Sequence, residues 1–116
     1  MLRLTSGGIG IDHGDVVLFS DFEHDGEMWR GEGPRLNRVA VTFSAAYPRP
    51  PHVQVSVSML DISNASNARF DVKAENIDTD GFEIVFRTWS DTQVARARVA
   101  WTAMGELAHD DGWELY

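Results

Sequence analysis

The chain has 116 residues, 43% of them hydrophobic and 24% charged, with a net charge of −8 and a pI near 4.7. This length suits one domain with a modest core, and we expect a single domain over residues 1–116. The negative charge argues against nucleic acid as a partner, because binding to phosphates depends on Lys and Arg. The lack of cysteine excludes disulfides and thiolate metal sites, and no apolar stretch is long enough to predict membrane insertion.

Residues 1–38 do not have one regular pattern. Leu2–Ile11 is rich in glycine with alternating apolar residues, which is typical of an edge strand or an arm that pairs with another element. Val16–Phe19 is a short apolar run that favours a strand. Ser20–Arg38 is polar and contains many turn residues, so we interpret it as a long functional loop.

The pattern becomes regular in the middle of the chain. Val39–Phe43 alternates and predicts a strand that ends before the proline-rich corner Tyr47–Pro51. His52–Met59 is the clearest half-buried strand, because every second residue is Val or Met. Arg69–Glu75 alternates in the same way after a turn of Ser and Asn residues.

Gly81–Trp101 contains two alternating runs on either side of the polar turn Ser90–Gln93, a pattern that predicts a β-hairpin. Trp89 falls in the polar phase of the first run, whereas Trp101 falls in the apolar phase of the second. We therefore predict that Trp101 belongs to the core and that Trp89 points into solvent. A large exposed ring of this kind often marks a ligand site.

Five or six strands, with turns every 8 to 12 residues and no helical period, predict an all-β fold, an antiparallel β-sandwich. The best-defined part is residues 39–103. For the tail, residues 104–116, the sequence leaves open whether it packs on a neighbour or extends freely.

The order of motifs between Val39 and Ala103 resembles the H-type lectin domain family. The matching segments are Val41-Thr42-Phe43, Tyr47 through Pro51, Ser58-Met59-Leu60-Asp61, Asn67-Ala68-Arg69, Gly81-Phe82, Thr88-Trp89 and Ala100-Trp101. The resemblance implies a six-stranded antiparallel sandwich that forms a homotrimer, with a paired hexamer as a further form. It also implies binding of glycans of the galactose or N-acetylgalactosamine type, at sites between neighbouring subunits.

The family's site residues match this sequence in part. The site arginine corresponds to Arg69 and the site tryptophan to Trp89. The histidine that follows the tryptophan in the family is Ser90 here, and a later tyrosine is Ala95. The departures at Ser90 and Ala95 leave the identity of the monosaccharide open.

The acidic residue that the family takes from the neighbouring subunit corresponds to Glu32, with Gly31 beside it. The resemblance thus predicts a lectin that attaches to a surface glycan or polysaccharide, with a site formed by Arg69, Trp89 and Ser90 of one subunit together with Gly31 and Glu32 of the next. The N-terminus has no signal peptide pattern. A location outside the cell, on its surface or on a particle is nevertheless our hypothesis.

Other interpretations remain open. Trp89 could pack against a neighbouring subunit, and Arg69 could be a solvated cross-strand partner of acids. If the sugar site has lost its function through the changes at Ser90 and Ala95, the chain would fit a structural or receptor-binding component of a phage-like particle or surface spike. Catalysis is not expected, because a small sandwich with a shallow site has little room to enclose and distort a substrate.

The loop from Asp21 to Glu32 resembles a calcium-binding loop, because its acids alternate and Glu32 is the twelfth residue. Its third residue, Glu23, should be Asp or Asn in an EF-hand, and Pro34 follows instead of a helix. We therefore expect no cofactor, with calcium at this loop as the alternative. The four histidines show no zinc spacing.

Overall fold

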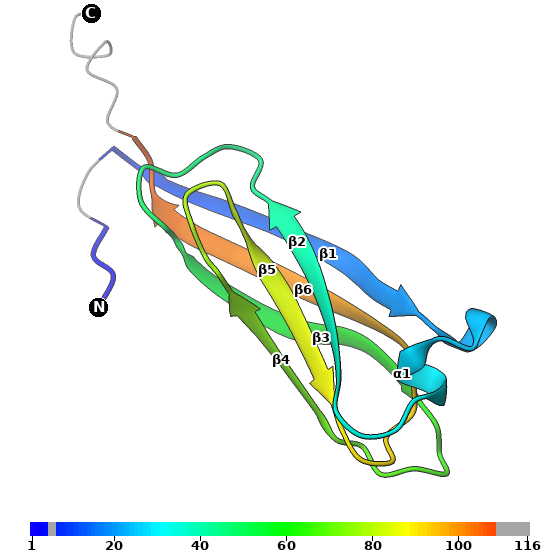
Figure 1. Ribbon diagram of the computed structural model, residues 1–116. Coiled ribbons are helices and arrows are strands. Elements are labelled where there is room, and N and C mark those ends of the chain that lie inside the picture. The colour runs from blue at the N-terminus through cyan, green and yellow to red at the C-terminus, as the bar shows by residue number, and fades with distance from the viewer. Residues whose placement is uncertain (5–6, 109–116) are drawn as a thin grey trace, which may run out of the picture.

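Alternating residues bury one face of each strand between two sheets. The computed structural model describes residues 1–4 and 7–108, and within them six strands form two three-stranded antiparallel sheets (Figure 1). The strands are β1 (Ile9–Ser20), β2 (Arg35–Thr42), β3 (His52–Ile62), β4 (Phe70–Glu75), β5 (Gly81–Thr88) and β6 (Val94–Glu106). One sheet has the order β1-β6-β3 and the other β2-β5-β4. The predicted six-stranded antiparallel sandwich is confirmed.

The core lies between the central strands of the two sheets. Phe82 and Phe86 of β5 are almost fully buried, and the ring of Phe82 meets Trp101 of β6 edge to face at 5.4 Å between centroids. Trp101 is 8% exposed and Trp89 is 42% exposed. The predicted phases of both tryptophans are therefore confirmed.

Strands β5 and β6 do not form the predicted hairpin. β5 pairs with β2 and β4, whereas β6 pairs with β1 and β3, so the chain crosses from one sheet to the other after Trp89. The hairpin prediction was wrong because alternation reports which face of a strand is buried and carries no information about which strand pairs with it.

Strand β1 is one continuous element, whereas the sequence suggested an edge strand from Leu2 and a separate short run. Pairing with β6 continues from Ile9 to Ser20, with one irregularity. Gly14 interrupts the apolar pattern because the ring of Trp101 lies against it, and a Cβ there would be 2.5 Å from the indole nitrogen. Gly10 and Asp12 also lie on the inward side, whereas Ile9 and Ile11 are exposed, so the inward side of β1 has no apolar run before Val16. The sequence therefore hides the continuity of the strand.

The loop between β1 and β2 contains two short helices that the sequence did not predict, the 3₁₀-helix η1 (Phe22–His24) and α1 (Glu27–Arg30). One turn of helix is too short to show a period. β2 also begins at Arg35, earlier than the predicted Val39. No helix in the described part of the chain is both long and apolar enough to cross a membrane.

β6 continues to Glu106, into the segment 104–116 that the sequence analysis treats as the tail. Residues 109–116, which include most of that tail and His109, lie outside the described residues.

The two ends of the sandwich differ. In Figure 1, α1, the β5–β6 loop and the β3–β4 loop meet at the end of the molecule opposite to the chain termini. Trp89 begins the β5–β6 loop and therefore belongs to this end. We call it the loop end.

Near the opposite end, Asp12 of β1 fastens the β2–β3 loop. One carboxylate oxygen accepts a hydrogen bond from the backbone N–H of Ser44 at 2.7 Å, and the other accepts one from its hydroxyl at 3.0 Å. The bond from the Ser44 N–H is the main reason why the pKa of Asp12 lies below its ordinary value of 3.8, although partial burial opposes the shift.

We predict that Asp12→Asn lowers the melting temperature at pH 7 and that its effect disappears in acid. A lowered pKa stabilises the fold above the ordinary value of 3.8, and this contribution is lost as the pH falls through the lowered pKa. Melting curves of both proteins between pH 2 and 7 test this. A difference that stays constant across the range would contradict the assignment.

Candidate functional site

The strand register places three side chains in one row at the loop end. Thr88 of β5 is opposite Phe70 of β4 and opposite Arg35 of β2. One residue beyond these pairs the chain has Arg69, Trp89 and Pro34. Residues that are opposed in neighbouring strands point to the same face. We therefore assign Trp89 to a position between Arg69 and Pro34.

The indole ring of Trp89 is open to solvent while its backbone is held firmly. The neighbouring Thr88 is 1% exposed, and its hydroxyl donates a hydrogen bond to the carbonyl of Arg69 at 2.6 Å. The contact fixes the end of β5 against the start of β4. Trp89 thus presents a large apolar surface on a rigid support.

Arg69 faces the β5–β6 loop. Its Nη1 lies 2.7 Å from a carboxylate oxygen of Asp91, and both side chains are well exposed. An ion pair this exposed adds little stability, but it orients the guanidinium group. Among the described residues, Nε and Nη2 have no hydrogen-bond acceptor, so these donors remain available to a ligand.

Asp91 was not among the residues predicted for the site, because the sequence favoured a role in the turn over contact with a ligand. Its second oxygen accepts a weak hydrogen bond from the side-chain amide of Asn67 at 3.4 Å. One signal in the sequence could have identified Asp91: it is an acid in the turn just after the exposed tryptophan, and an arginine of the predicted site could pair with it.

Buried Thr92 joins the two loops that carry these groups. Its hydroxyl donates to the carbonyl of Asn67 at 2.5 Å and accepts from the backbone N–H of Arg69 at 3.1 Å. The β3–β4 and β5–β6 loops are therefore fixed relative to each other.

Ser90 is exposed and has a left-handed backbone conformation, with φ of 61°. Its carbonyl accepts a hydrogen bond from the backbone N–H of Gly33 at 3.0 Å. The predicted residues Gly31 and Glu32 therefore lie in a segment that contacts Ser90 of the same chain. Gly31 has a structural reason to be glycine, because a Cβ there would lie 2.5 Å from the carbonyl oxygen of Glu27.

Arg35 holds this end together, and the sequence analysis did not identify it. It is only 4% exposed, and its guanidinium donates to backbone carbonyls at 2.7 to 3.4 Å. The acceptors belong to Gly33, Glu27, Met28, Ser90 and Thr92. Carbonyl dipoles therefore satisfy this buried cation, and no carboxylate in the described residues pairs with it.

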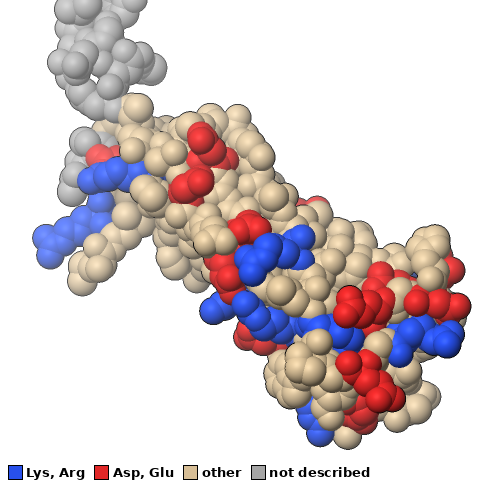
Figure 2. Space-filling view, viewed as in Figure 1, with Lys and Arg blue, Asp and Glu red and all other residues tan. Residues whose placement is uncertain are grey.

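The outer face of the β2-β5-β4 sheet carries mixed charges beside the site (Figure 2). Arg87 contacts Glu75 at 2.9 Å, and Arg38 contacts Glu75 and Glu83 at 3.4 and 3.5 Å. The hydrogen bond from Arg87 is the main reason why the pKa of Glu75 is lowered. Acids therefore balance these arginines, and the face is not a basic patch.

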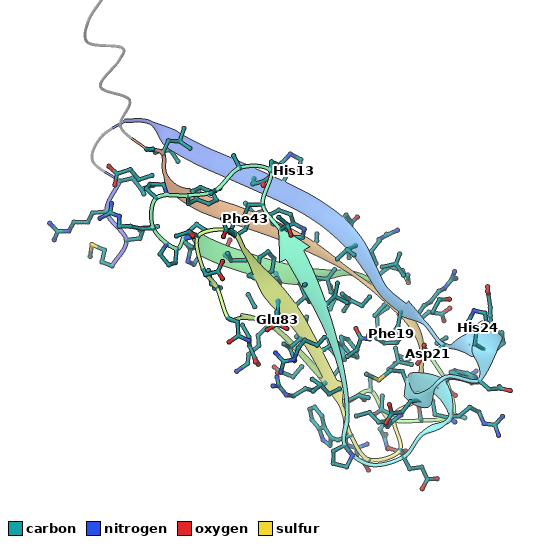
Figure 3. All side chains as sticks on the ribbon, turned by 45° about the horizontal axis from the view of Figure 1, so that its top comes forward. His13, Phe19, Asp21, His24, Phe43 and Glu83 are labelled. Atoms are coloured by element: carbon teal, nitrogen blue, oxygen red, sulfur yellow. The ribbon has the colours of Figure 1, made fainter. Side chains whose placement is uncertain are left out.

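The acidic loop has a structural use for Asp21. Its carboxylate accepts the backbone N–H of Met28 at 3.0 Å, at the start of α1 (Figure 3). Nowhere in the described residues do three His, Asp or Glu side chains gather as a metal site would require. Figure 3 shows His13 and His24 far apart, on β1 and on the tip of the loop.

We predict that Arg35→Lys destabilises the protein by on the order of 3 kcal/mol. Lysine keeps the charge, but its single ammonium group cannot reach carbonyls of three segments and leaves several of them unpaired. Urea unfolding measures the effect. Arg30→Lys, at an exposed arginine paired with Asp25, is the matched control and should change stability little. Equal stabilities of the two variants would contradict the role of Arg35.

Comparison with known proteins supports the same assignment for fold and family. The sequence pattern of the H-type lectin domain matches residues 38–104, which is more than half of the chain. "ATP synthase subunits region ORF 7" of Fuscovulum blasticum is 47% identical over 115 residues and covers 99% of both chains. A discoidin-1 chain of Dictyostelium discoideum is 34% identical over 74 residues. This match covers 63% of the present chain and only 29% of the discoidin-1 chain.

Two solved structures share the fold. Recombinant discoidin II of Dictyostelium discoideum has a TM-score of 0.73 at 23% identity, over 84% of this chain and 37% of that one. The tailspike protein gp49 of Pseudomonas phage LKA1 has a TM-score of 0.53 at 18% identity, over 87% of this chain and 15% of that one. At such identities the likeness concerns the fold alone. With the family pattern covering most of the sandwich, the chain belongs to the H-type lectin domain family.

Proposed function

We propose that the chain is a non-catalytic carbohydrate-binding domain for glycans of the galactose or N-acetylgalactosamine type. Its family is one of lectin domains, which bind carbohydrate and are typically not catalytic. The proposed site combines Arg69, Trp89 and Ser90 of one subunit with Gly31 and Glu32 of its neighbour. The observation that carries the proposal is the exposed ring of Trp89 beside an arginine that a carboxylate orients.

These groups suit the two kinds of surface on a sugar. The C–H face of a pyranose can stack on the indole of Trp89. Hydroxyl groups around the ring can accept from the unoccupied donors of Arg69 and donate to the carboxylate of Asp91. Because the ion pair of Arg69 and Asp91 is already formed, less side-chain entropy is lost when a sugar binds.

A homotrimer, with a paired hexamer as a further form, suits this geometry. The Gly31–Glu32 segment and the Trp89 corner lie at the same end of each chain. In a closed ring of subunits side by side, the Gly31–Glu32 segment of one subunit would therefore lie at the same level as Trp89 of the next. One shallow site would have a Kd of about 0.1–1 mM, and three sites facing a surface glycan would raise avidity about 100-fold.

We predict that Trp89→Ala abolishes binding on a glycan array and changes the melting temperature little. Trp101→Ala should have the opposite primary effect, because it leaves a cavity in the core and costs on the order of 3 kcal/mol or more. Thermal melts and the array read the two effects separately. Equal loss of stability in both variants would contradict the assigned roles, and unchanged array binding by Trp89→Ala would refute the site.

A receptor-binding role in a larger particle or spike is the second candidate. Ser90 replaces the family's histidine, and Ala95, at the position of its tyrosine, is buried and carries only a methyl group. Two of the expected sugar contacts are therefore missing. A blank glycan array together with tight binding to a protein receptor would favour this candidate over the lectin.

A further inference from the structure

A hollow of about 240 Å³ lies on the β2 side of Trp89, away from Arg69. Its lining residues are Pro34, Arg35, Leu36, Arg87, Thr88 and Trp89. Leu36 is 48% exposed and is opposite Arg87 in the register, directly behind the row that contains Trp89. The hollow therefore shares the Trp89 side chain with the proposed sugar site.

The polar groups in this wall already have partners. The guanidinium of Arg35 is bonded to backbone carbonyls, Arg87 binds Glu75 at 2.9 Å, and the hydroxyl of Thr88 donates to the carbonyl of Arg69. What remains for a ligand is mainly carbon, from Pro34 and Leu36 and from the ring of Trp89. Sugar hydroxyls placed here would lose water without gaining comparable hydrogen bonds.

The volume sets a second limit. Pockets for whole drug-sized ligands are usually about 300–1,000 Å³, so this hollow suits one substituent better than a complete ligand. Its position beside Trp89 means that such a substituent can be attached to a sugar that already stacks on the ring. Apolar groups gain free energy in proportion to the surface that they remove from water.

We propose that the hollow formed by Pro34, Leu36, Trp89 and the stem of Arg87 is a subsite for an apolar substituent of the bound sugar, an alkyl or aryl group on the ring. The proposal rests on the proposed function, because the substituent is delivered by the sugar at Trp89. It adds a selectivity that Arg69 and Asp91 do not provide, since those residues recognise hydroxyls.

The test compares 4-nitrophenyl and methyl galactosides of the same anomeric form, for both anomers, by calorimetric titration. The wild-type protein should bind the aryl glycoside of one anomer at least about fivefold more tightly. Leu36→Ala should reduce this ratio to about one. Ile11→Ala, at an exposed apolar residue of β1 in the other sheet, is the matched control and should preserve it.

A ratio of affinities is insensitive to a partial loss of folded protein. As a second measurement, NMR should show cross-relaxation between the aryl protons and the methyl groups of Leu36. Equal binding of the two glycosides, or a preference that survives Leu36→Ala, would overturn the subsite and leave the sugar site standing. If Leu36→Ala changes the oligomeric state and not the preference, another copy covers the hollow and the proposal is wrong. Failure of these galactosides and of the corresponding N-acetylgalactosaminides to bind would overturn the proposed function and the subsite together.

Discussion

The loop end of this sandwich depends on one buried cation. The guanidinium of Arg35 donates hydrogen bonds to backbone carbonyls of α1, of Gly33 and of the β5–β6 loop. No carboxylate in the described residues pairs with it. Irregular backbone at the end of a sandwich has many carbonyls that no strand can satisfy, and one planar group with five donors satisfies several of them at once. Because the same guanidinium donates to the carbonyls of Ser90 and Thr92, it fixes the position of the backbone segment that contains Trp89 and Asp91.

The resulting corner is small, rigid and shallow, and these properties determine what it can do. The rigid backbone allows Trp89 to stay exposed without collapsing onto the sheet, and the pair of Arg69 and Asp91 gives the corner a polar side. In the proposed function such a shallow surface would bind a few groups of a sugar weakly, and repetition of the domain in an assembly would raise the avidity. Mixed charges on the adjacent sheet face keep the surface from attracting polyanions in general.

Much of this architecture could be predicted from the sequence, for reasons that particular residues make clear. The period of two assigned Trp101 to the core and Trp89 to solvent, since burial on one face is a local property of a strand. The pairing of β5 and β6 could not be predicted, because the partner of a strand is a property of the whole fold. Arg35 was missed since a buried arginine looks the same in sequence as a solvated one. The place of Asp91 beside Arg69 was missed because an acid in a turn usually forms hydrogen bonds to the nearby backbone only. The family resemblance supplied Arg69, Ser90, Gly31 and Glu32, and their roles as ligands stay predictions.

The central claim is that Trp89, Arg69 and Asp91 bind a galactose-type sugar in a site that a neighbouring subunit completes. A crystal structure of the protein grown with N-acetylgalactosamine tests it most directly. The account predicts a pyranose stacked on the indole of Trp89, with its hydroxyls bonded to Arg69 and Asp91 and with Glu32 of an adjacent subunit within reach. A sugar bound elsewhere, or a corner that stays empty at saturating sugar, would contradict it.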